Sequence, residues 1–519
     1  MCRPRRGHRV DDLGFRRWGD LYLHEPHPYL RSGGDVHGDP DPGGRRRRRG
    51  EAGQGSQGAG ALRVRRRLRL RGLIWALVLG LAAQAASLHY DLGLTLSPEG
   101  DLSGAVTVSG AAVGAWRGLV FRLYPAALSP TYLELIGVQT EGGPLEWDQV
   151  HPTAFTVPLP TAPGQTFSLR LEFRGEVPEF ERAEGYGTYS RSQGAVVLSQ
   201  AYPLLSPWRD DGWLVEPVFP WGDPTVAEVA DYTAQVDLPP GWGLVASGEE
   251  RELSPGLFQV AGENLRELAL VALKGHVEVT VQAGEVPIHG YFLPDHQEAG
   301  AAALVVTARS LRLYADLFGP YPFPELDVVE VPLKEAAGVE YPGLILAGEA
   351  YFDRYPGDPL FFPMIFAHEV AHQWWYAQVG NDQVAEPWLD EALVTYTSGL
   401  YFGAQGRLEE LLDYWEASYL RGRARNPTAT VASPLWEFPD GAGYGGIVYS
   451  GGALFFHAIR GRMGDEAFFR ALRRYLAEYR WRMARGEDLL AILEEESPKP
   501  LKDLFQEWLG LPSLDTASP

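Results

Sequence analysis

The stretch HEVAHQWW, residues 368–375, combines two histidines four positions apart with a glutamate between them. In an α-helix, residues four apart lie on the same face one turn apart, so His368 and His372 can direct two imidazoles at one metal ion. Glu369, one step further round, would lie beside that ion. An amphipathic helix can also carry two histidines by coincidence, so the spacing favours a zinc site without settling it.

A third ligand is expected from a neighbouring segment, because catalytic zinc keeps three protein ligands and an open position for water. In PWLDEALVTY, residues 387–396, Glu391 follows His372 after eighteen intervening residues. A helix, a loop at 380–382 and an antiparallel second helix would bring this carboxylate back over the histidines. Asp390 is its neighbour, but one helical step away it should point elsewhere. The three residues together predict one Zn²⁺ ion per chain.

These motifs resemble the M1 family of zinc metallopeptidases, the gluzincin group of aminopeptidase N and leukotriene A4 hydrolase. The resemblance rests on HEVAHQWW, WLDEALVTY, LFGPYPFPELDVVEVP, GVEYPGLIL and YGGIVYSGGALFFHAIR, and runs from about residue 310 to 510, more loosely over the region before it. It implies that His368, His372 and Glu391 bind zinc. It also implies that Glu369 is the general base, which takes a proton from water activated by the metal and returns it to the leaving amine.

The family's exopeptidase motif, GxMEN, is matched by Gly338-Val339-Glu340-Tyr341, which departs from it at Met and Asn. The resemblance implies that Glu340, with Gly338 in the same motif, binds the α-ammonium group of the substrate, and a carboxylate suits a cation physically. The alternative is a surface glutamate in a loop. A substrate-contacting glutamine of the family's β domain has one match, Gln200 in LSQAYP, and a DEP-like segment is replaced by WGDP at 221–224.

The family's catalytic tyrosine precedes a helix in a Y-x-K-G pattern. Tyr449-Ser450-Gly451-Gly452 fits this pattern except that glycine replaces lysine, and Tyr444, five residues earlier, competes for the role. A phenol near the metal can donate a hydrogen bond to the developing oxyanion. The resemblance favours Tyr449.

The predicted function is that of an exported zinc aminopeptidase, which hydrolyses the N-terminal residue from peptides with a free amino terminus. A zinc endopeptidase is the alternative among enzymes, because the chain ends near FQEWLG, where larger relatives continue into a helical domain over the active site. An open cleft is therefore expected. A non-catalytic peptide-binding protein on the same scaffold is the other alternative. The sequence sets neither the preferred first residue nor the oligomeric state.

Residues 1–85 are not expected to form a domain, since RRRRR and GEAGQGSQGAG carry no apolar period. Residues 62–85 predict a signal peptide with a basic stretch, the apolar run LIWALVLGLAA and a small-x-small cleavage site at 83–85. The apolar run is shorter than the ~20 residues that span a bilayer, so no stable transmembrane span is expected. We expect a periplasmic or secreted protein, tethered to the membrane if the signal is not cleaved, and a true start downstream of Met1.

The remaining chain predicts an α+β multidomain fold. Residues 88–278 alternate with period two between Gly and Pro breaks, which predicts an antiparallel β domain. Residues 279–512 have mostly helical spacing, which predicts a mainly helical domain with few strands, and the resemblance implies a thermolysin-like zinc-peptidase fold for it. Helices are expected over about 298–319, 360–378, 388–403, 407–421, 452–462, 465–480 and 501–510.

Composition excludes several kinds of function. With 519 residues, 45% of them hydrophobic, the chain is long enough for two or three packed domains. The single cysteine, Cys2, lies in the N-terminal segment, so neither disulfides nor a thiol nucleophile are expected. A formal net charge of −21 argues against nucleic acid as a partner.

Overall fold

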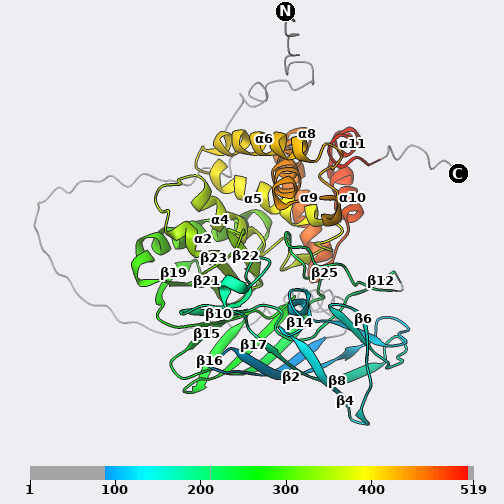
Figure 1. Ribbon diagram of the computed structural model, residues 1–519. Helices are drawn as coiled ribbons and strands as arrows, with labels where there is room; N and C mark the ends of the chain where they lie inside the picture. Colours follow the sequence, from blue (N-terminus) through cyan, green and yellow to red (C-terminus); the bar gives the residue numbers. More distant parts are fainter. Residues whose placement is uncertain (1–87, 211, 512–519) are drawn as a thin grey trace, which may run out of the picture. The chain divides into compact units, whose positions relative to one another are not determined.

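The computed structural model describes residues 88–210 and 212–511, which belong to one compact unit (Figure 1). The segment predicted as non-domain, 1–85, and the signal peptide predicted at 62–85 lie outside the described residues. The same holds for the final residue of the predicted second domain, at 512.

An eight-stranded sheet dominates the N-terminal half. Its strands alternate buried and exposed positions, as in HYDLGLTL of β1, where every second side chain points into the core. The pairs are antiparallel except β1 with β14, which run parallel, so the predicted antiparallel domain contains one parallel pair. In sheet order the strands are β16 (Glu249–Ser254), β17 (Leu257–Leu265), β14 (Ala230–Asp237), β1 (His89–Leu96), β2 (Asp101–Ala111), β8 (Thr166–Glu176), β4 (Glu134–Thr140) and β5 (Gly143–Pro144).

Two four-stranded sheets complete the β-rich half, with a short pair, β12 (Trp208–Arg209) and β13 (Gly212–Trp213). One contains β15 (Gly243–Ala246), β18 (Leu270–Leu273), β10 (Ala195–Leu198) and β9 (Tyr189–Arg191); the other contains β11 (Leu204–Leu205), β3 (Leu119–Arg122), β7 (Ala154–Val157) and β6 (Asp148–His151). The first packs its apolar side chains against strands of the second domain.

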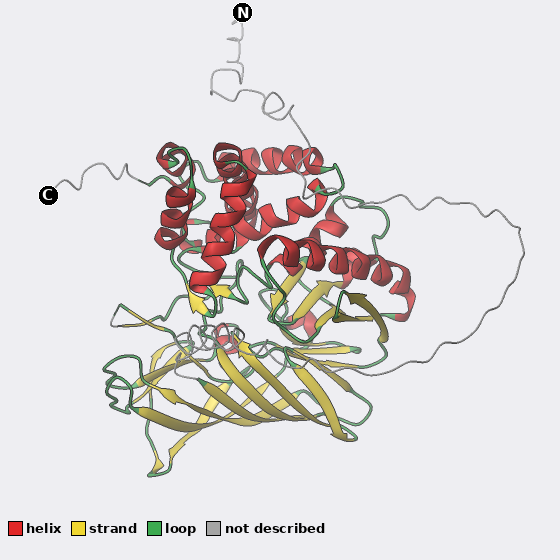
Figure 2. Ribbon diagram, turned by 180° about the vertical axis from the view of Figure 1, so that it is seen from behind, coloured by secondary structure: helices red, strands yellow, loops and turns green. Residues whose placement is uncertain are grey.

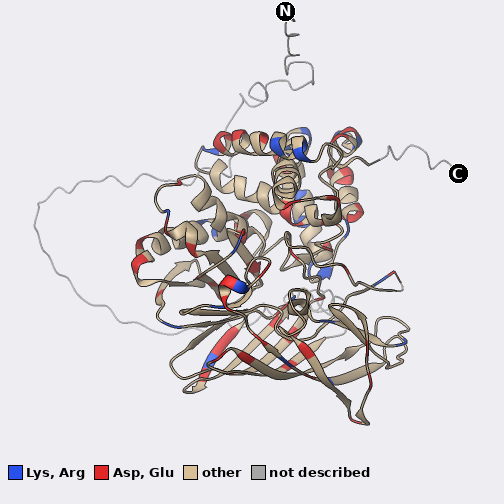
Figure 3. Cartoon of the chain, in the orientation of Figure 1, with Lys and Arg blue, Asp and Glu red and all other residues tan. Residues whose placement is uncertain are grey.

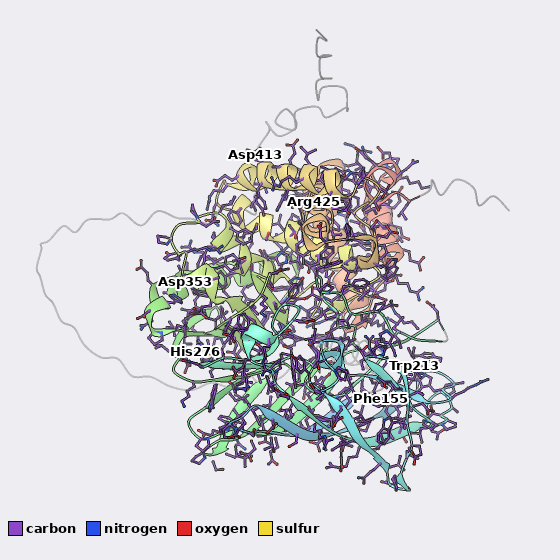
Figure 4. All side chains as sticks on the ribbon, viewed as in Figure 1. Phe155, Trp213, His276, Asp353, Asp413 and Arg425 are labelled. Atoms are coloured by element: carbon purple, nitrogen blue, oxygen red, sulfur yellow. The ribbon has the colours of Figure 1, made fainter. Side chains whose placement is uncertain are left out.

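The second domain is mainly helical with few strands, as predicted, but it opens with a five-stranded mixed sheet that the helical spacing did not indicate. In sheet order its strands are β19 (Val277–Ala283), β20 (Val286–Phe292), β21 (Leu326–Val331), β23 (Leu344–Gly348) and β22 (Gly338–Tyr341). LDVVEV and LILAG are buried along their whole length, and such runs lack the period-two signal of a half-exposed strand. His276, labelled in Figure 4, lies between β18 and β19, so the predicted boundary at 279 falls inside the first strand of this sheet.

Helices make up the rest of the second domain (Figure 2). Most match the predicted ranges closely, but the helix expected over 360–378 ends at Ala371, with His372 as its C-cap. The α-helices are α2 (Gln297–Phe318), α3 (Glu349–Phe352), α4 (Phe361–Ala371), α5 (Glu391–Gly403), α6 (Leu408–Arg425), α7 (Gly441–Tyr444), α8 (Gly452–Met463), α9 (Asp465–Tyr479), α10 (Gly486–Glu496) and α11 (Lys502–Leu509). The α+β architecture, a multi-sheet β domain followed by a mainly helical domain, is confirmed.

Figure 3 shows aspartate and glutamate on strands and helices alike. None of the helices within 88–210 and 212–511 combines the length and apolar character needed to cross a bilayer.

Candidate active site

His368, His372 and Glu391 converge on one point, with one ligand atom from each within 4.8 Å of the others. The Nε2 atoms of the two histidines are 3.2 Å apart, since His372 continues the helical backbone one turn beyond His368. Glu391 is the first residue of α5, and its Oε2 lies 3.2 Å from Nε2 of His368 and 3.7 Å from Nε2 of His372. The three predicted ligands are therefore brought together.

The donor set fits zinc. Burial lowers the pKa of His368 to about 3 and holds that of His372 well below its usual value, so both rings are neutral and offer lone pairs. Oε2 of Glu391 is buried without a hydrogen-bond partner. Tetrahedral ligands ~2.0–2.1 Å from an ion lie roughly 3.3 Å from one another, close to the separations in this cluster. Two imidazoles and one carboxylate are a common set for catalytic zinc.

Two contacts fix the orientation of these ligands. Nδ1 of His372 lies 3.2 Å from the carbonyl oxygen of Trp375, which leaves Nε2 as the metal-facing nitrogen. Asp390 caps α5: its carboxylate accepts the backbone N–H of Glu391 at 2.9 Å and an Nδ2–H of Asn381 at 3.1 Å. Asp390 is therefore occupied at the helix end, while the next residue faces the histidines.

Glu369 lies against the backbone of Gly338. A Cβ atom on that glycine would be 2.4 Å from Oε1 of Glu369, too close for any side chain to be accommodated without displacing the carboxylate. Glu369 is 5% exposed, and its Oε2 has no hydrogen-bond partner. Burial, and secondarily the charge of Asp223, raises the pKa of Glu369 well above its usual range. Gly338 thus provides the space for this carboxylate, and its expected contact with substrate stays a prediction.

Tyr449 lies beside the ligands, in a π-helix over Gly445–Gly451. Its ring stacks on that of His368, with centroids 5.6 Å apart and planes 6° from parallel, and its hydroxyl hydrogen-bonds to Glu391. Tyr444 lies edge-on behind it at 5.4 Å, 3% exposed, with its hydroxyl unpartnered. Single turns of π-helix often occur at functional sites. The geometry gives Tyr449, rather than its competitor, direct contact with the ligand set.

Loss of the hydroxyl group is therefore expected to have a large effect at one of these two tyrosines and a small effect at the other. Tyr449→Phe is expected to lower kcat for peptide hydrolysis by ~10²–10³-fold, if this phenol donates the hydrogen bond to the oxyanion that the resemblance implies. Tyr444→Phe removes the hydroxyl of the tyrosine that packs behind Tyr449. It should leave kcat within a few-fold of wild type. Steady-state kinetics of both variants at equal zinc content measure this, and the reverse order would exchange the two assignments.

Glu340 lies on β22 and is 6% exposed. One of its oxygens lies within 4.8 Å of ligand atoms of Glu369 and His372, and Oε1 is 3.5 Å from Nε2 of Gln383. Burial, followed by the charges of Asp223 and Glu369, raises the pKa of Glu340 well above its usual range. A buried carboxylate among other carboxylates is stabilised by a cation, which the ammonium group of a peptide can supply.

Gln200 does not touch the ligand set. It has a left-handed backbone, with φ of 48°, and its amide donates to Glu267, which also accepts the hydroxyl of Tyr376 at 2.5 Å. Burial raises the pKa of Glu267 to about 7. The neighbouring Arg266 donates to the carbonyl oxygens of Tyr376 and Gln378. Arg266 and Glu267 of the β domain thus support the loop that follows His372.

Asp223 is the site residue that sequence reasoning missed. It lies in WGDP at 221–224, where only a departure from the family pattern was noted, and its side chain hydrogen-bonds to Glu391. Its charge also contributes to the raised pKa values of Glu340, Glu369 and Asp390. An aspartate before a proline in a turn has many structural uses, so the sequence holds no signal that would place it here.

Residues 302–508 match the peptidase family M1 domain. Aminopeptidase M1-C of Oryza sativa subsp. japonica is 32% identical over 255 residues, which cover 46% of this chain and 28% of that protein. Aminopeptidase N of Lactobacillus delbrueckii subsp. lactis is 27% identical over 224 residues, covering 40% and 26%. The alignments thus span less than a third of the length of these curated relatives.

Solved structures share the fold over most of the chain. The crystal structure of an M1 zinc metallopeptidase from Deinococcus radiodurans aligns with a TM-score of 0.59 and 25% identity, over 80% of this chain and 91% of that one. A mutant from the same organism, bound to a Tyr-Ser-Ala substrate, aligns with a TM-score of 0.59 and 24% identity, over 84% and 96%. The matched domain, the shared two-domain fold and the three converging ligands agree, and residues 302–508 carry a peptidase family M1 domain.

Proposed function

We propose that the protein is a zinc-dependent aminopeptidase, which removes the N-terminal residue from peptides with a free amino terminus. The observation that carries the proposal is the buried carboxylate of Glu340, which lies beside the metal-ligand cluster with no lysine or arginine paired to it among the described residues. A substrate ammonium group bound there would hold the first peptide bond near the cluster. Relatives named as aminopeptidases support the same activity.

His368, His372 and Glu391 would hold the zinc ion. When bound, zinc supplies Lewis acidity, which polarises a carbonyl group and lowers the pKa of water toward ~7. Glu369 takes a proton from the attacking water as general base and passes it to the nitrogen of the leaving amine. Its raised pKa makes this carboxylate a stronger base than an ordinary glutamate. Tyr449 donates a hydrogen bond from its hydroxyl to the carbonyl oxygen as negative charge develops there.

A change at Glu340 tests whether the enzyme recognises the amino terminus. Glu340→Gln is expected to lower kcat/KM for aminoacyl-nitroanilides by roughly 10-fold or more, since a charge-assisted hydrogen bond contributes about 1.5–3 kcal/mol. Acetylated versions of the same substrates lack the ammonium group, so their turnover by wild type should be far lower and should not fall further in the variant. Parallel assays of both substrate sets measure the two effects.

Glu335→Gln is the matched control, because it removes an exposed carboxylate five residues earlier in the same segment. It should leave all rates unchanged. Equal turnover of free and acetylated substrates by wild type would favour a zinc endopeptidase instead. Stoichiometric zinc and peptide binding without hydrolysis of either set would favour a non-catalytic binding protein.

We also propose that the protein is exported. The support is the basic stretch, apolar run and small-x-small site within residues 62–85. Expression of the full reading frame in a bacterial host, followed by fractionation and N-terminal mass spectrometry, is expected to give a mature chain that begins just after residue 85 outside the cytoplasm. Peptides from residues 1–60 in the purified protein would contradict the cleavage.

A further inference from the structure

A second group of carboxylates lies where the β domain meets the catalytic domain. Glu250 is on β16 of the eight-stranded sheet, Glu325 immediately precedes β21, and Asp327 is on β21 itself. One carboxylate oxygen from each lies within 4.8 Å of the others. None of these residues belongs to the zinc cluster, and the group joins two segments that are distant in sequence.

Asp327 is the feature that needs an explanation. It is 1% exposed, yet neither of its carboxylate oxygens has a hydrogen-bond partner. Oε2 of Glu250 is likewise buried and unpartnered. A buried ionised carboxylate without a partner is strongly unfavourable, so Asp327 requires either a proton or a bound cation.

The surroundings add negative charge and supply little to balance it. Glu278 and Glu249 lie close enough to influence the cluster electrostatically, and among the described residues no lysine or arginine forms an ion pair with its three members. His289 is the cationic candidate: its Nε2 is 3.7 Å from Oε2 of Glu325, but its Nδ1 lies 3.1 Å from Oε1 of Glu278. One shared imidazole cannot neutralise the group.

Two tyrosines complete the surroundings, Tyr291 and Tyr321, whose pKa values are raised by burial and by the same carboxylates. Burial, followed by the charge of Glu250, raises the pKa of Asp327 well above its usual range, while burial and the charge of Glu325 raise the pKa of Glu250 to about 8. Without a cation, the cluster would therefore retain protons at neutral pH.

The chemistry of the donors selects the cation. We propose that Glu250, Glu325 and Asp327 bind one calcium ion that joins the two domains. All donors are carboxylate oxygens, which suit hard cations rather than zinc or copper. Three carboxylates from two separate segments match the six to eight oxygens and flexible geometry of calcium better than the octahedral shell of magnesium, which usually keeps several waters.

Water can complete the coordination. The side chain of Glu325 is 27% exposed, and it lines a cavity of about 410 Å³ together with Glu249, Pro342 and Gly343. The site is thus closed on the Asp327 side and open to solvent on the other, as a calcium site with several water ligands requires.

The position of the site indicates a structural role. Asp327 pairs in register with Leu344 of β23, which pairs with Tyr341 of β22, next to Glu340. An ion that ties β16 to β21 would therefore hold the β domain against the sheet that carries this glutamate. We expect calcium to raise stability, with zinc content unaffected.

Calcium binding can be tested on the full, zinc-loaded chain in chelator-free buffer. Equilibrium dialysis with ⁴⁵Ca is expected to give one calcium per chain. CaCl₂ should raise Tm by several degrees once the site is saturated. MgCl₂ and NaCl at matched ionic strength should have much smaller effects. No stoichiometric calcium, together with a Tm shift equal to that in NaCl, would overturn the proposal and assign protons to the cluster.

Variants identify the ligands. Glu250→Gln and Glu325→Gln should each weaken calcium binding at least 10-fold and abolish most of the Tm shift, while zinc content, measured on the same samples by mass spectrometry, stays at one per chain. Glu285→Gln removes an exposed carboxylate from the turn between β19 and β20 and should bind calcium like wild type. Equal calcium affinity in all three variants would place the ion elsewhere and contradict the proposal.

Discussion

Glu369→Gln is expected to lower kcat for an aminoacyl-nitroanilide by about 10²–10⁴-fold, the range that a positioned general base contributes. The glutamine has nearly the same volume, so it should occupy the space beside Gly338 without disturbing the backbone. Its amide, however, can neither take a proton from water nor return one to the leaving nitrogen. KM should change much less than kcat, because the group acts on the transition state rather than on the bound ground state.

Zinc content separates this effect from loss of metal. The variant should retain one zinc per chain and an unchanged Tm, measured by mass spectrometry and thermal denaturation on the same preparation. A variant that keeps more than a tenth of wild-type kcat with zinc bound would exclude Glu369 as the base. A variant that loses zinc would instead show that the carboxylate helps to hold the metal.

The metal ligands could be predicted because their arrangement is local. Two histidines four apart on a helix share a face wherever that helix lies, and His372 keeps helical backbone angles although the helix ends at Ala371. Glu391 required one further assumption, that a second helix returns over the first. Asp390 caps α5, so this second helix begins at Glu391, which is the metal ligand itself.

The remaining parts of the site depend on contacts between distant segments, which spacing does not encode. Asp223 and Glu267 reach the site from the β domain, and no local pattern distinguishes them from other buried acids. The close approach of Gly338 to Glu369 depends on how β22 packs on α4. The π-helix around Tyr449 adds one residue to a turn, which a helical period of 3.6 cannot reveal.

The buried site is rich in negative charge. Glu340, Glu369, Glu391 and Asp223 influence one another's ionisation, and burial raises the pKa of each. The two histidines beside them are held neutral by burial. Positive charge must therefore come from ligands, a divalent metal at one end and a substrate ammonium at the other. Glu391 is the one charged residue among the three metal ligands. Its replacement should consequently have the largest effect on zinc binding and activity.

Glu391→Gln is expected to weaken zinc binding by more than the 10–100-fold that loss of an outer-shell partner costs, and to abolish measurable peptidase activity at trace zinc. The amide is a poorer ligand because it lacks the charge. Asp390→Asn is a matched control one residue away, since asparagine still caps α5 and the side chain does not face the histidines. Zinc content after dialysis against a zinc buffer, and activity as a function of free zinc, distinguish the two variants. Partial recovery of Glu391→Gln at high zinc would support weakened binding, whereas full zinc occupancy and activity at trace zinc would remove this residue from the ligand set.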